Sequence, residues 1–381
     1  MGIIDLVEIG SMKVPIVTFV LGTRPEAIKL APVIETFNNS RKLKIRTVLT
    51  GQHKEMVNQV MDFFNLTEDK NLNLMKKTQT LTYITSSVLE GISNELSKNK
   101  SNLLLVQGDT SSALAAALAA FYNNVPIAHV EAGLRSKELY DPYPEEANRR
   151  LISQIAELHF APTEFSKENL IKSGLKNNIF VTGNTVIDSL LKVSKIVKKF
   201  KHDRFDPIEQ KLILTTIHRR ENWGYRLEKI LEAITITLKK FKDVVFLIPL
   251  HKNKIVREPI SKLLGNEERV ILVEPLNYSE MVSAMKESHF VLTDSGGLQE
   301  EAPALGKPVL VLRETTERPE AVNAGTAKLV GINPENIVRN ITELLTNNTL
   351  YDSMSTAINP FGDGTSSEKI LMHCSNFLYK K

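Results

Sequence analysis

Three carboxylates in the first half of the chain are candidates for moving a proton. Asp109, Glu131 and Glu145 occur in the segments QGDT, HVEAGLR and YPEEANRR. Removing and returning a carbon-bound proton needs a base and an acid, and carboxylates serve when burial or a like charge raises their pKa. Acidic residues after strands also cap helices or pair with arginines such as Arg135 and Arg149. The group as a whole favours acid–base chemistry at one sheet edge.

A phosphate-binding turn is predicted in GTRPEAIKLAPVI. A strand ends at Gly22 and a helix opens at Pro25, where the missing N–H costs nothing. Backbone N–H groups at a helix start attract anions, and Arg24 and Lys29 add two cations suited to a diphosphate. The alternative is an ordinary strand–helix turn with a surface arginine.

A second turn of this kind occurs in TDSGGLQEEAPAL. Ser295 can cap the helix and reach a phosphate, and Gly296 and Gly297 let a ligand approach the backbone closely. At 100° per residue, Glu301 lies near the apolar face of this helix, where it suits the hydroxyls of a ribose. Glu300 points the opposite way, and we expect it to be solvated.

The segment HRREN places His218 beside two arginines directly after a strand, a combination that can neutralise a leaving diphosphate. His251, in PLHKNK, is more typical of a structural histidine. No spacing of histidine and carboxylate resembles a zinc site, so no metal is predicted.

The composition is that of a two-domain globular protein. The chain has 381 residues, a net charge of +4 and no long basic block, which argues against nucleic acid as the main partner. Its single cysteine, Cys374, fits a reducing cytosol. No run approaches the roughly 18 apolar residues of a membrane span, and the first residues make a poor signal peptide. We expect a cytoplasmic protein that does not enter a membrane.

Short apolar runs alternate with helical segments, such as 110–122 and 227–241, as in units built on a parallel sheet. The predicted strands are 15–22, 44–51, 102–109, 126–133, 158–163, 211–218, 244–251, 270–276, 289–296 and 308–314. Polar residues follow many of them: Arg24, His53, Asp109, Glu131, His218, His251, Glu274, Asp294 and Ser295. Ligands bind outside these carboxyl ends.

We predict an α/β fold of two doubly wound Rossmann-like domains, 12–185 and 186–360, whose parallel sheets face a central cleft. The segment 361–381 is expected to form a helix that packs back on the first domain. A helix and linker are expected within 164–210, and a separate connection within 346–365. Residues 1–11 are expected to precede the fold.

The chain resembles the non-hydrolysing UDP-N-acetylglucosamine 2-epimerases over about residues 13–375. The resemblance rests on GTRPEAIKLAPVI, TGQHKEM, QGDT, HVEAGLRS, YPEEANRR, TGNTVID, HRREN, TDSGGLQEEAPALGKPVLVLRETTERPEAV and AGTAKLVG. It implies a GT-B-type fold and reversible conversion of UDP-GlcNAc to UDP-ManNAc through UDP elimination, 2-acetamidoglucal and re-addition, for cell-surface polysaccharide precursors. It implies neither nicotinamide nor metal, a UDP-sugar as the binding partner, and a homodimer.

The resemblance also implies residue roles. The acid–base residues are Asp109, Glu131 and Glu145, with His218 near the diphosphate. The UDP-binding residues are Arg24, Lys29, His218, Ser295, Gly296, Gly297 and Glu301, with uracil held mainly by backbone near Met281. The roles of Arg313 and Arg318 stay open.

The family's regulatory site for a second substrate molecule is only partly present. Gln52 and His251 match it, whereas Glu55, Thr78 and the segment 250–254 depart from the family pattern. The departures predict that substrate does not activate this enzyme in the usual way, and a strongly sigmoidal dependence of the rate on UDP-GlcNAc would contradict this. Two other activities stay open: a hydrolysing epimerase that releases ManNAc and UDP, and a GT-B glycosyltransferase.

Overall fold

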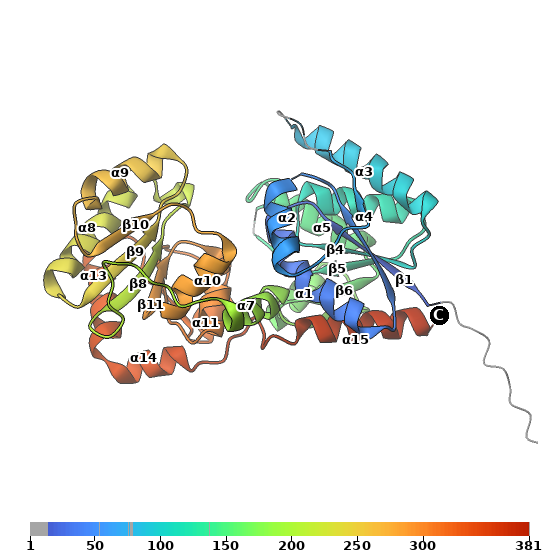
Figure 1. Cartoon of the computed structure of the whole chain (residues 1–381). Coiled ribbons are helices and arrows are strands. Elements are labelled where there is room, and N and C mark those ends of the chain that lie inside the picture. Colours follow the sequence, from blue (N-terminus) through green and yellow to red (C-terminus); the bar gives the residue numbers. More distant parts are fainter. Residues whose placement is uncertain (1–13, 53, 75, 77–78, 137, 381) are drawn as a thin grey trace, which may run out of the picture. The chain divides into compact units, whose positions relative to one another are not determined.

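The computed structural model describes residues 14–52, 54–74, 76, 79–136 and 138–380. The chain forms two compact units (Figure 1). Unit 1 combines the part of the chain up to residue 185 with the C-terminal residues 365–381, and unit 2 consists of residues 186–364. The predicted extension 1–11, His53, Thr78 and the side chain of Glu55 lie outside the described residues.

Unit 1 is a doubly wound unit built on a seven-stranded parallel sheet, counted over the described residues, in the order β3-β2-β1-β4-β5-β6-β7. The strands are β1 (Ile16–Leu21), β2 (Lys44–Leu49), β3 (Lys70–Asn71), β4 (Leu103–Gln107), β5 (Ile127–Val130), β6 (Leu158–Ala161) and β7 (Ile179–Val181). The helices are α1 (Arg24–Ser40), α2 (Lys54–Phe63), α3 (Leu81–Lys98), α4 (Ser111–Tyr122), α5 (Glu145–Ile155), α6 (Glu164–Lys172) and α15 (Ser366–Tyr379).

Helix α4 shows why this sequence packs tightly against the sheet. Its sequence, SSALAAALAAFY, is mostly alanine, so α3 and α5 can both approach it closely. The helix begins where the Thr110 hydroxyl accepts a hydrogen bond from the Ala113 N–H, at 3.0 Å. This cap directly follows Asp109, so the start of α4 sets where the backbone of that residue lies.

The C-terminal helix belongs to unit 1. Helix α15 packs along α1 (Figure 1), and the Tyr379 hydroxyl donates to the Lys42 carbonyl at 2.5 Å. The His373 ring stacks on Phe180 of β7, with 3.7 Å between the ring centroids.

Unit 2 repeats the doubly wound design with a six-stranded parallel sheet, again counted over the described residues, in the order β10-β9-β8-β11-β12-β13. The strands are β8 (Lys211–Thr216), β9 (Val244–Pro249), β10 (Val270–Val273), β11 (Phe290–Thr293), β12 (Val309–Val311) and β13 (Ala327–Leu329). The helices are α8 (Tyr225–Lys240), α9 (Lys254–Leu264), α10 (Tyr278–Glu287), α11 (Gly296–Ala304), α12 (Pro319–Asn323), α13 (Pro334–Thr346) and α14 (Asn348–Ser355), with a short 3₁₀ helix at Arg220–Asn222.

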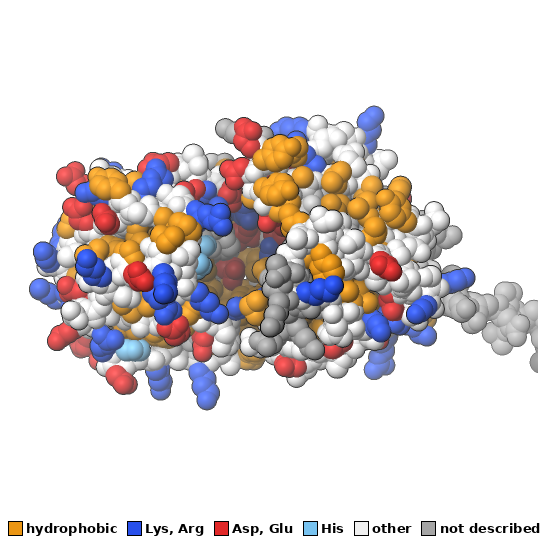
Figure 2. Space-filling model, turned by 90° about the horizontal axis from the view of Figure 1, so that it is seen from above, with side chains coloured by type: hydrophobic (Ala, Val, Ile, Leu, Met, Phe, Trp, Pro, Cys, Tyr) orange, Lys and Arg blue, Asp and Glu red, His pale blue; other side chains and the backbone are white. Residues whose placement is uncertain are grey.

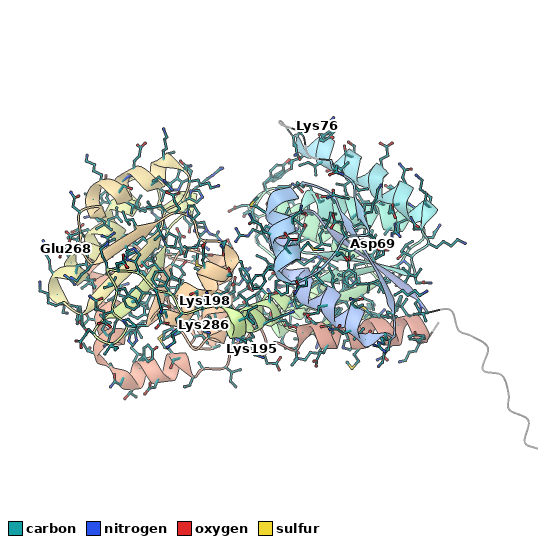
Figure 3. All side chains as sticks on the ribbon, in the orientation of Figure 1. Asp69, Lys76, Lys195, Lys198, Glu268 and Lys286 are labelled. Carbon is teal, nitrogen blue, oxygen red and sulfur yellow. The ribbon has the colours of Figure 1, made fainter. Side chains whose placement is uncertain are left out.

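Helix α7 (Thr185–Ile196) enters unit 2 and is tied to α10. The Ser283 hydroxyl donates to the Lys198 carbonyl at 2.7 Å, and Lys286 Nζ donates to the Ser194 carbonyl; Figure 3 labels Lys198 and Lys286. Charges of both signs are interspersed over the face in Figure 2, without a basic block. No helix in the described part of the chain is long and apolar enough to cross a membrane.

The predicted GT-B-type class, with two doubly wound parallel-sheet domains, is confirmed. One local prediction was wrong. The segment 164–210 is more than a helix and linker, since it contains β7 and two helices. The connection 346–365 contains the short helix α14. The strands β3, β7 and β13 were not predicted, because each is only two or three residues long and, unlike the equally short β12, is not part of a longer apolar run.

Candidate active site

Each sheet has one point where the strand order reverses, between β1 and β4 in unit 1 and between β8 and β11 in unit 2. Ligands of doubly wound folds bind at the carboxyl ends of the strands there. In unit 1 these ends lead into Arg24 and Asp109. In unit 2 they lead into His218 and Asp294. Candidate residues from the sequence thus stand at both of these points.

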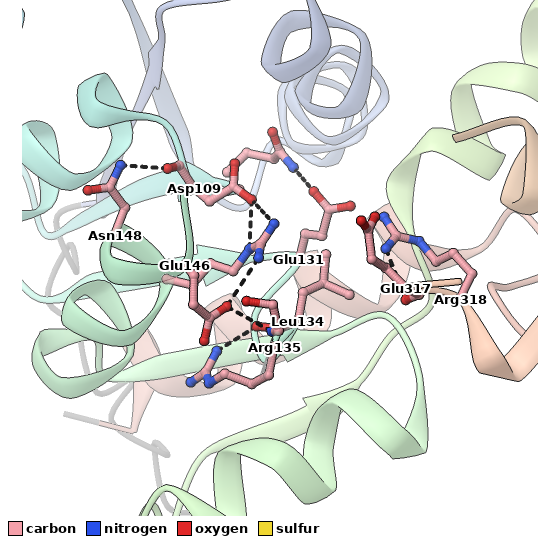
Figure 4. Close-up of polar contacts among 12 residues, drawn as sticks. Asp109, Glu131, Leu134, Arg135, Glu146, Asn148, Glu317 and Arg318 are labelled. Carbon is pink, nitrogen blue, oxygen red and sulfur yellow. Dashed lines mark hydrogen bonds and ion pairs between the residues drawn. The ribbon is translucent and has the colours of Figure 1, made fainter. Parts of the chain in front are cut away.

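Asp109 is held by helix α5 (Figure 4). Arg149 contacts its carboxylate Oδ2 twice, through Nε at 2.8 Å and Nη2 at 2.7 Å. Asn148 Nδ2 donates to the Asp109 backbone carbonyl at 2.8 Å. The alternative of an ion pair with Arg149 is therefore realised, and it fixes the direction of a side chain that remains 23% exposed.

Glu131 sits in a left-handed backbone conformation, with φ +65°, which is uncommon for a residue with a side chain. Lys29 Nζ donates to both of its carboxylate oxygens, at 2.6 and 2.7 Å. Gln107 Nε2 and Asn184 Nδ2, the latter at 3.0 Å, also donate to it. Lys29, which was predicted to face a diphosphate, is thus paired with a carboxylate. It connects the predicted phosphate-binding turn to the predicted acid–base residues.

Glu145 is the first residue of α5 and is half-buried. Asn148 and Arg149, one turn along the same helix, contact Asp109, and β4 pairs with β5 in the sheet. The structure therefore brings the three predicted carboxylates to the same edge of unit 1. The next residue, Glu146, is fully buried and had no role in the sequence prediction.

The turn that leads into α1 is held by a side chain of α1 itself. Buried Glu26 accepts hydrogen bonds from the backbone N–H groups of Gly22, at 2.7 Å, and Thr23, at 2.6 Å, and from the Thr110 hydroxyl. Burial raises the pKa of Glu26, although these hydrogen bonds oppose the rise. The sequence did not show that Glu26 folds back onto these two N–H groups, which precede α1, and phosphate binding at the start of α1 stays a prediction. Arg24 remains partly exposed beside them.

In unit 2, buried Asp294 orients His218. Its carboxylate lies 3.0 Å from His218 Nδ1 and accepts the backbone N–H groups of His218 and Arg219, both at 3.0 Å, and Asn222 Nδ2 at 3.1 Å. Burial raises the pKa of Asp294, but the bonds from His218 and the backbone outweigh it and hold the pKa below its ordinary value. His218 is 41% exposed, so its Nε2 can face a ligand.

Helix α11 begins at Gly296, with Ser295 in the N-cap position. Its side chain makes no cap hydrogen bond, contrary to expectation. Gly297 is exposed at the helix start, and a Cβ there would lie 3.5 Å from Glu301 Oε1. Ser295, Gly297 and Glu301 therefore lie on one side of the first turn.

The prediction for Glu300 was wrong: it is 3% exposed and paired with Arg318 (Arg318 is labelled in Figure 4). Asn359 Nδ2 also donates to the Glu300 carbonyl at 2.9 Å. Helical periodicity assigned Glu300 to the side opposite the apolar face, but the chain after β12 and near residue 359 covers that side too.

Three arginines and two glutamates surround this edge of unit 2, a cluster that the sequence did not reveal. Arg219 forms a bidentate pair with Glu317, at 2.9 and 3.0 Å. Arg313, 7% exposed, lies 3.6 Å from Glu317 and donates to Glu221 at 2.5 Å. Burial raises the pKa of Glu317, but Arg219, Arg313 and Arg318 outweigh it and lower the pKa to about 2. Arg219 and Arg313 are therefore held in fixed positions by Glu317 and Glu221 at this edge, where an anionic ligand could meet them.

The remaining predicted residues are placed as follows. The Met281 N–H is used within α10, where it donates to the Asn277 carbonyl at 2.9 Å, so the Met281 amide itself does not face a ligand. Gln52 Oε1 accepts from the Ser112 hydroxyl at 2.6 Å, at the start of α4. The His251 ring centroid lies 6.3 Å from that of His218. Among the described residues, no group of three or more His, Cys, Asp or Glu side chains could hold a metal.

The two doubly wound parallel-sheet units, which match solved structures of this architecture, place the chain in the GT-B class of folds. The family model for UDP-N-acetylglucosamine 2-epimerase matches residues 35–374, and the chain belongs to this family. The UDP-N-acetylglucosamine 2-epimerase of Campylobacter jejuni is 46% identical over 367 residues, covering 93% of this chain and 96% of that one.

Solved structures agree with this assignment. The UDP-GlcNAc 2-epimerase of Neisseria meningitidis, bound to UDP-GlcNAc, matches with a TM-score of 0.87 and 45% identity, covering 96% of this chain and all (100%) of that one. The co-structure of S. aureus MnaA with UDP matches with a TM-score of 0.85 and 43% identity, covering 96% and 97%. The family membership predicted from the motifs is confirmed.

Proposed function

We propose that this chain is a non-hydrolysing isomerase that interconverts UDP-GlcNAc and UDP-ManNAc and supplies precursors of cell-surface polysaccharide. The observation that carries the proposal is the grouping of Asp109, Glu131 and Glu145 at the carboxyl edge of unit 1. Relatives named as UDP-GlcNAc 2-epimerases, and a relative that binds UDP-GlcNAc, support the choice of substrate.

The proposed reaction proceeds by elimination and re-addition. A carboxylate of unit 1 takes the C2 proton of the sugar, the C1–O bond breaks, and its electron pair leaves with UDP, so that 2-acetamidoglucal forms. UDP then adds back at C1 while an acid returns a proton to the other face of C2. Base and acid must flank the ring, which requires more than one carboxylate.

In this proposal unit 2 binds UDP, with Ser295, Gly296 and Gly297 at the phosphates and Glu301 at the ribose. His218 lies beside the leaving diphosphate, where its Nε2 and the Arg219 side chain stabilise developing negative charge. Asp294 supports this by fixing the direction of the imidazole.

Proton NMR of UDP-GlcNAc and enzyme in D₂O tests the proposal. We expect deuterium at C2 in both UDP-sugars, because the C2 proton exchanges with solvent-derived protons on the base. Accumulation of ManNAc and UDP alone would support the hydrolysing alternative instead. No exchange without an added acceptor would support a glycosyltransferase, which has no use for a base at C2.

Replacing Gly297 by alanine separates folding from UDP binding. The added Cβ meets Glu301 Oε1 at 3.5 Å, which is ordinary van der Waals contact, and alanine stabilises a helix by about 0.5–1 kcal/mol over glycine. The melting temperature should therefore hold or rise slightly, whereas the Kd for UDP, measured by calorimetry, should rise at least about 10-fold because a ligand can no longer approach the backbone. Unchanged UDP affinity would place the phosphates elsewhere.

We further propose a homodimer. Phe121 and Tyr122 at the end of α4 are 54% and 64% exposed, and Leu151 on the neighbouring α5 is 54% exposed. Exposed apolar side chains on two neighbouring helices are typical of protein interfaces. Light scattering should give twice the mass of the chain, and Leu151→Glu should shift it toward one chain. A wild-type monomer would contradict this.

A further inference from the structure

Glu146 contacts Arg149, the residue that holds the Asp109 carboxylate. Its side chain is fully buried, whereas that of Glu145 beside it is half-buried. Its carboxylate accepts hydrogen bonds from the backbone N–H of Ser136 at 3.0 Å, from Arg149 Nη1 at 3.2 Å and from Arg150 Nε at 2.7 Å. A buried carboxylate is costly unless such donors surround it. These three donors compensate that cost, so Glu146 is a fixed point to which Arg149 is attached.

Arg149 joins Glu146 to Asp109, and these two acidic residues are labelled in Figure 4. Its Nη1 contacts Glu146 Oε2, while Nε and Nη2 contact Asp109 Oδ2. Because the guanidinium is planar and rigid, holding one end of it also sets the direction of the other. Glu146 thus controls where Arg149 holds the Asp109 carboxylate.

The two carboxylate oxygens of Asp109 have different surroundings. Arg149 makes two contacts with Oδ2, and Asn148 Nδ2 donates to the backbone carbonyl of Asp109. Within the described residues, no hydrogen-bond donor contacts Oδ1, and the side chain is 23% exposed. Oδ1 is therefore the oxygen that is presented to a ligand.

We propose that Glu146 is a positioning residue that acts through Arg149 to aim Asp109 Oδ1 at the reacting proton. The inference rests on the proposed function, since Asp109 must carry that proton. Proton transfer requires hydrogen-bond distance, and a misplacement of about 1 Å can cost roughly 100-fold in rate. Glu146 itself touches no substrate.

The helix supplies a matched control. Arg150 also pairs with Glu146, through Oε1, but its side chain is 46% exposed and makes none of the bonds to Asp109. If Glu146 served only to anchor α5, Glu146→Ala and Arg150→Ala would have similar effects. If Glu146 positions Asp109 through Arg149, only Glu146→Ala lowers the rate.

The test compares full-length variants by kcat, KM, melting temperature and C2 deuterium incorporation. Glu146→Ala should lower kcat and the exchange rate together by about 10- to 30-fold, with KM within about threefold. Glu146→Gln keeps an oxygen for Ser136 and Arg149 and should recover most of the rate. Arg150→Ala should stay within about threefold of wild type.

Glu146→Asp replaces Glu146→Ala if the alanine variant fails to fold. Aspartate keeps the charge but is one methylene shorter, so it cannot hold Arg149 in the same place, and kcat should again fall at least about 10-fold. Wild-type kcat in Glu146→Ala or Glu146→Asp, with an active wild-type enzyme, would overturn the positioning role alone. Absence of C2 exchange in the wild-type enzyme would instead overturn the proposed function.

Discussion

Asp109→Asn is expected to lower turnover by about 10³-fold while the Kd for UDP stays within about threefold of wild type. Asparagine has nearly the same shape, and its oxygen can still accept from Arg149, so the fold should persist. Its amide can neither take nor return a proton, which removes the chemical step. UDP binding should survive because Asp109 is not one of the proposed UDP-binding residues, and Ser295, Gly296 and Gly297 belong to unit 2.

NMR measures the turnover and calorimetry measures the Kd for UDP, so the two effects are determined separately. Asp69→Asn is the matched control, since Asp69 is also a carboxylate of unit 1 and accepts the Thr47 N–H at 2.7 Å beside β3 (Figure 3). Its asparagine variant keeps an acceptor and should turn over normally. Near-normal turnover of Asp109→Asn would remove Asp109 from the mechanism.

Asp294→Asn is expected to lower kcat by about 100-fold. Every group around the Asp294 carboxylate is a donor: His218 Nδ1, two backbone N–H groups and the Asn222 amide. An asparagine would turn its own NH₂ toward at least one of them. His218 then loses the acceptor that sets its ring orientation, so Nε2 no longer faces the leaving diphosphate reliably.

A double-mutant comparison distinguishes this role from a loss of folding. Since Asp294 is proposed to act through His218, the pair His218→Asn and Asp294→Asn should lose no more kcat than His218→Asn alone. Melting temperatures should be followed in parallel, because a buried position is being changed. Additive losses in kcat would show that Asp294 acts independently of His218.

Much of the architecture was predictable from sequence because it is local. A long apolar strand such as 102–109 and an alanine-rich helix such as 110–122 are recognisable from their own residues, because almost all of their side chains are apolar and become buried. The glycine-rich turn at 295–297 likewise predicts a helix start from a few adjacent residues. Short edge strands such as β7 carry too little of this pattern to be recognised.

The active-site contacts depend on residues that are distant in the chain. Arg149 reaches Asp109 across 40 positions, and Asp294 reaches His218 across 76, because neighbouring parallel strands end at one edge. Helical periodicity likewise misplaced Glu300, since it does not show what covers the outer side of α11.

The two parallel-sheet units, the family and the residue types at the strand ends are all encoded in local runs of residues and could be read from them. Three contacts are visible only once the chain is packed: Glu26 accepts the Thr23 N–H, Lys29 binds Glu131, and Glu146 binds the arginine that holds Asp109. The physical reason is that a buried charge takes whichever opposite charge or donor the packed elements bring within reach.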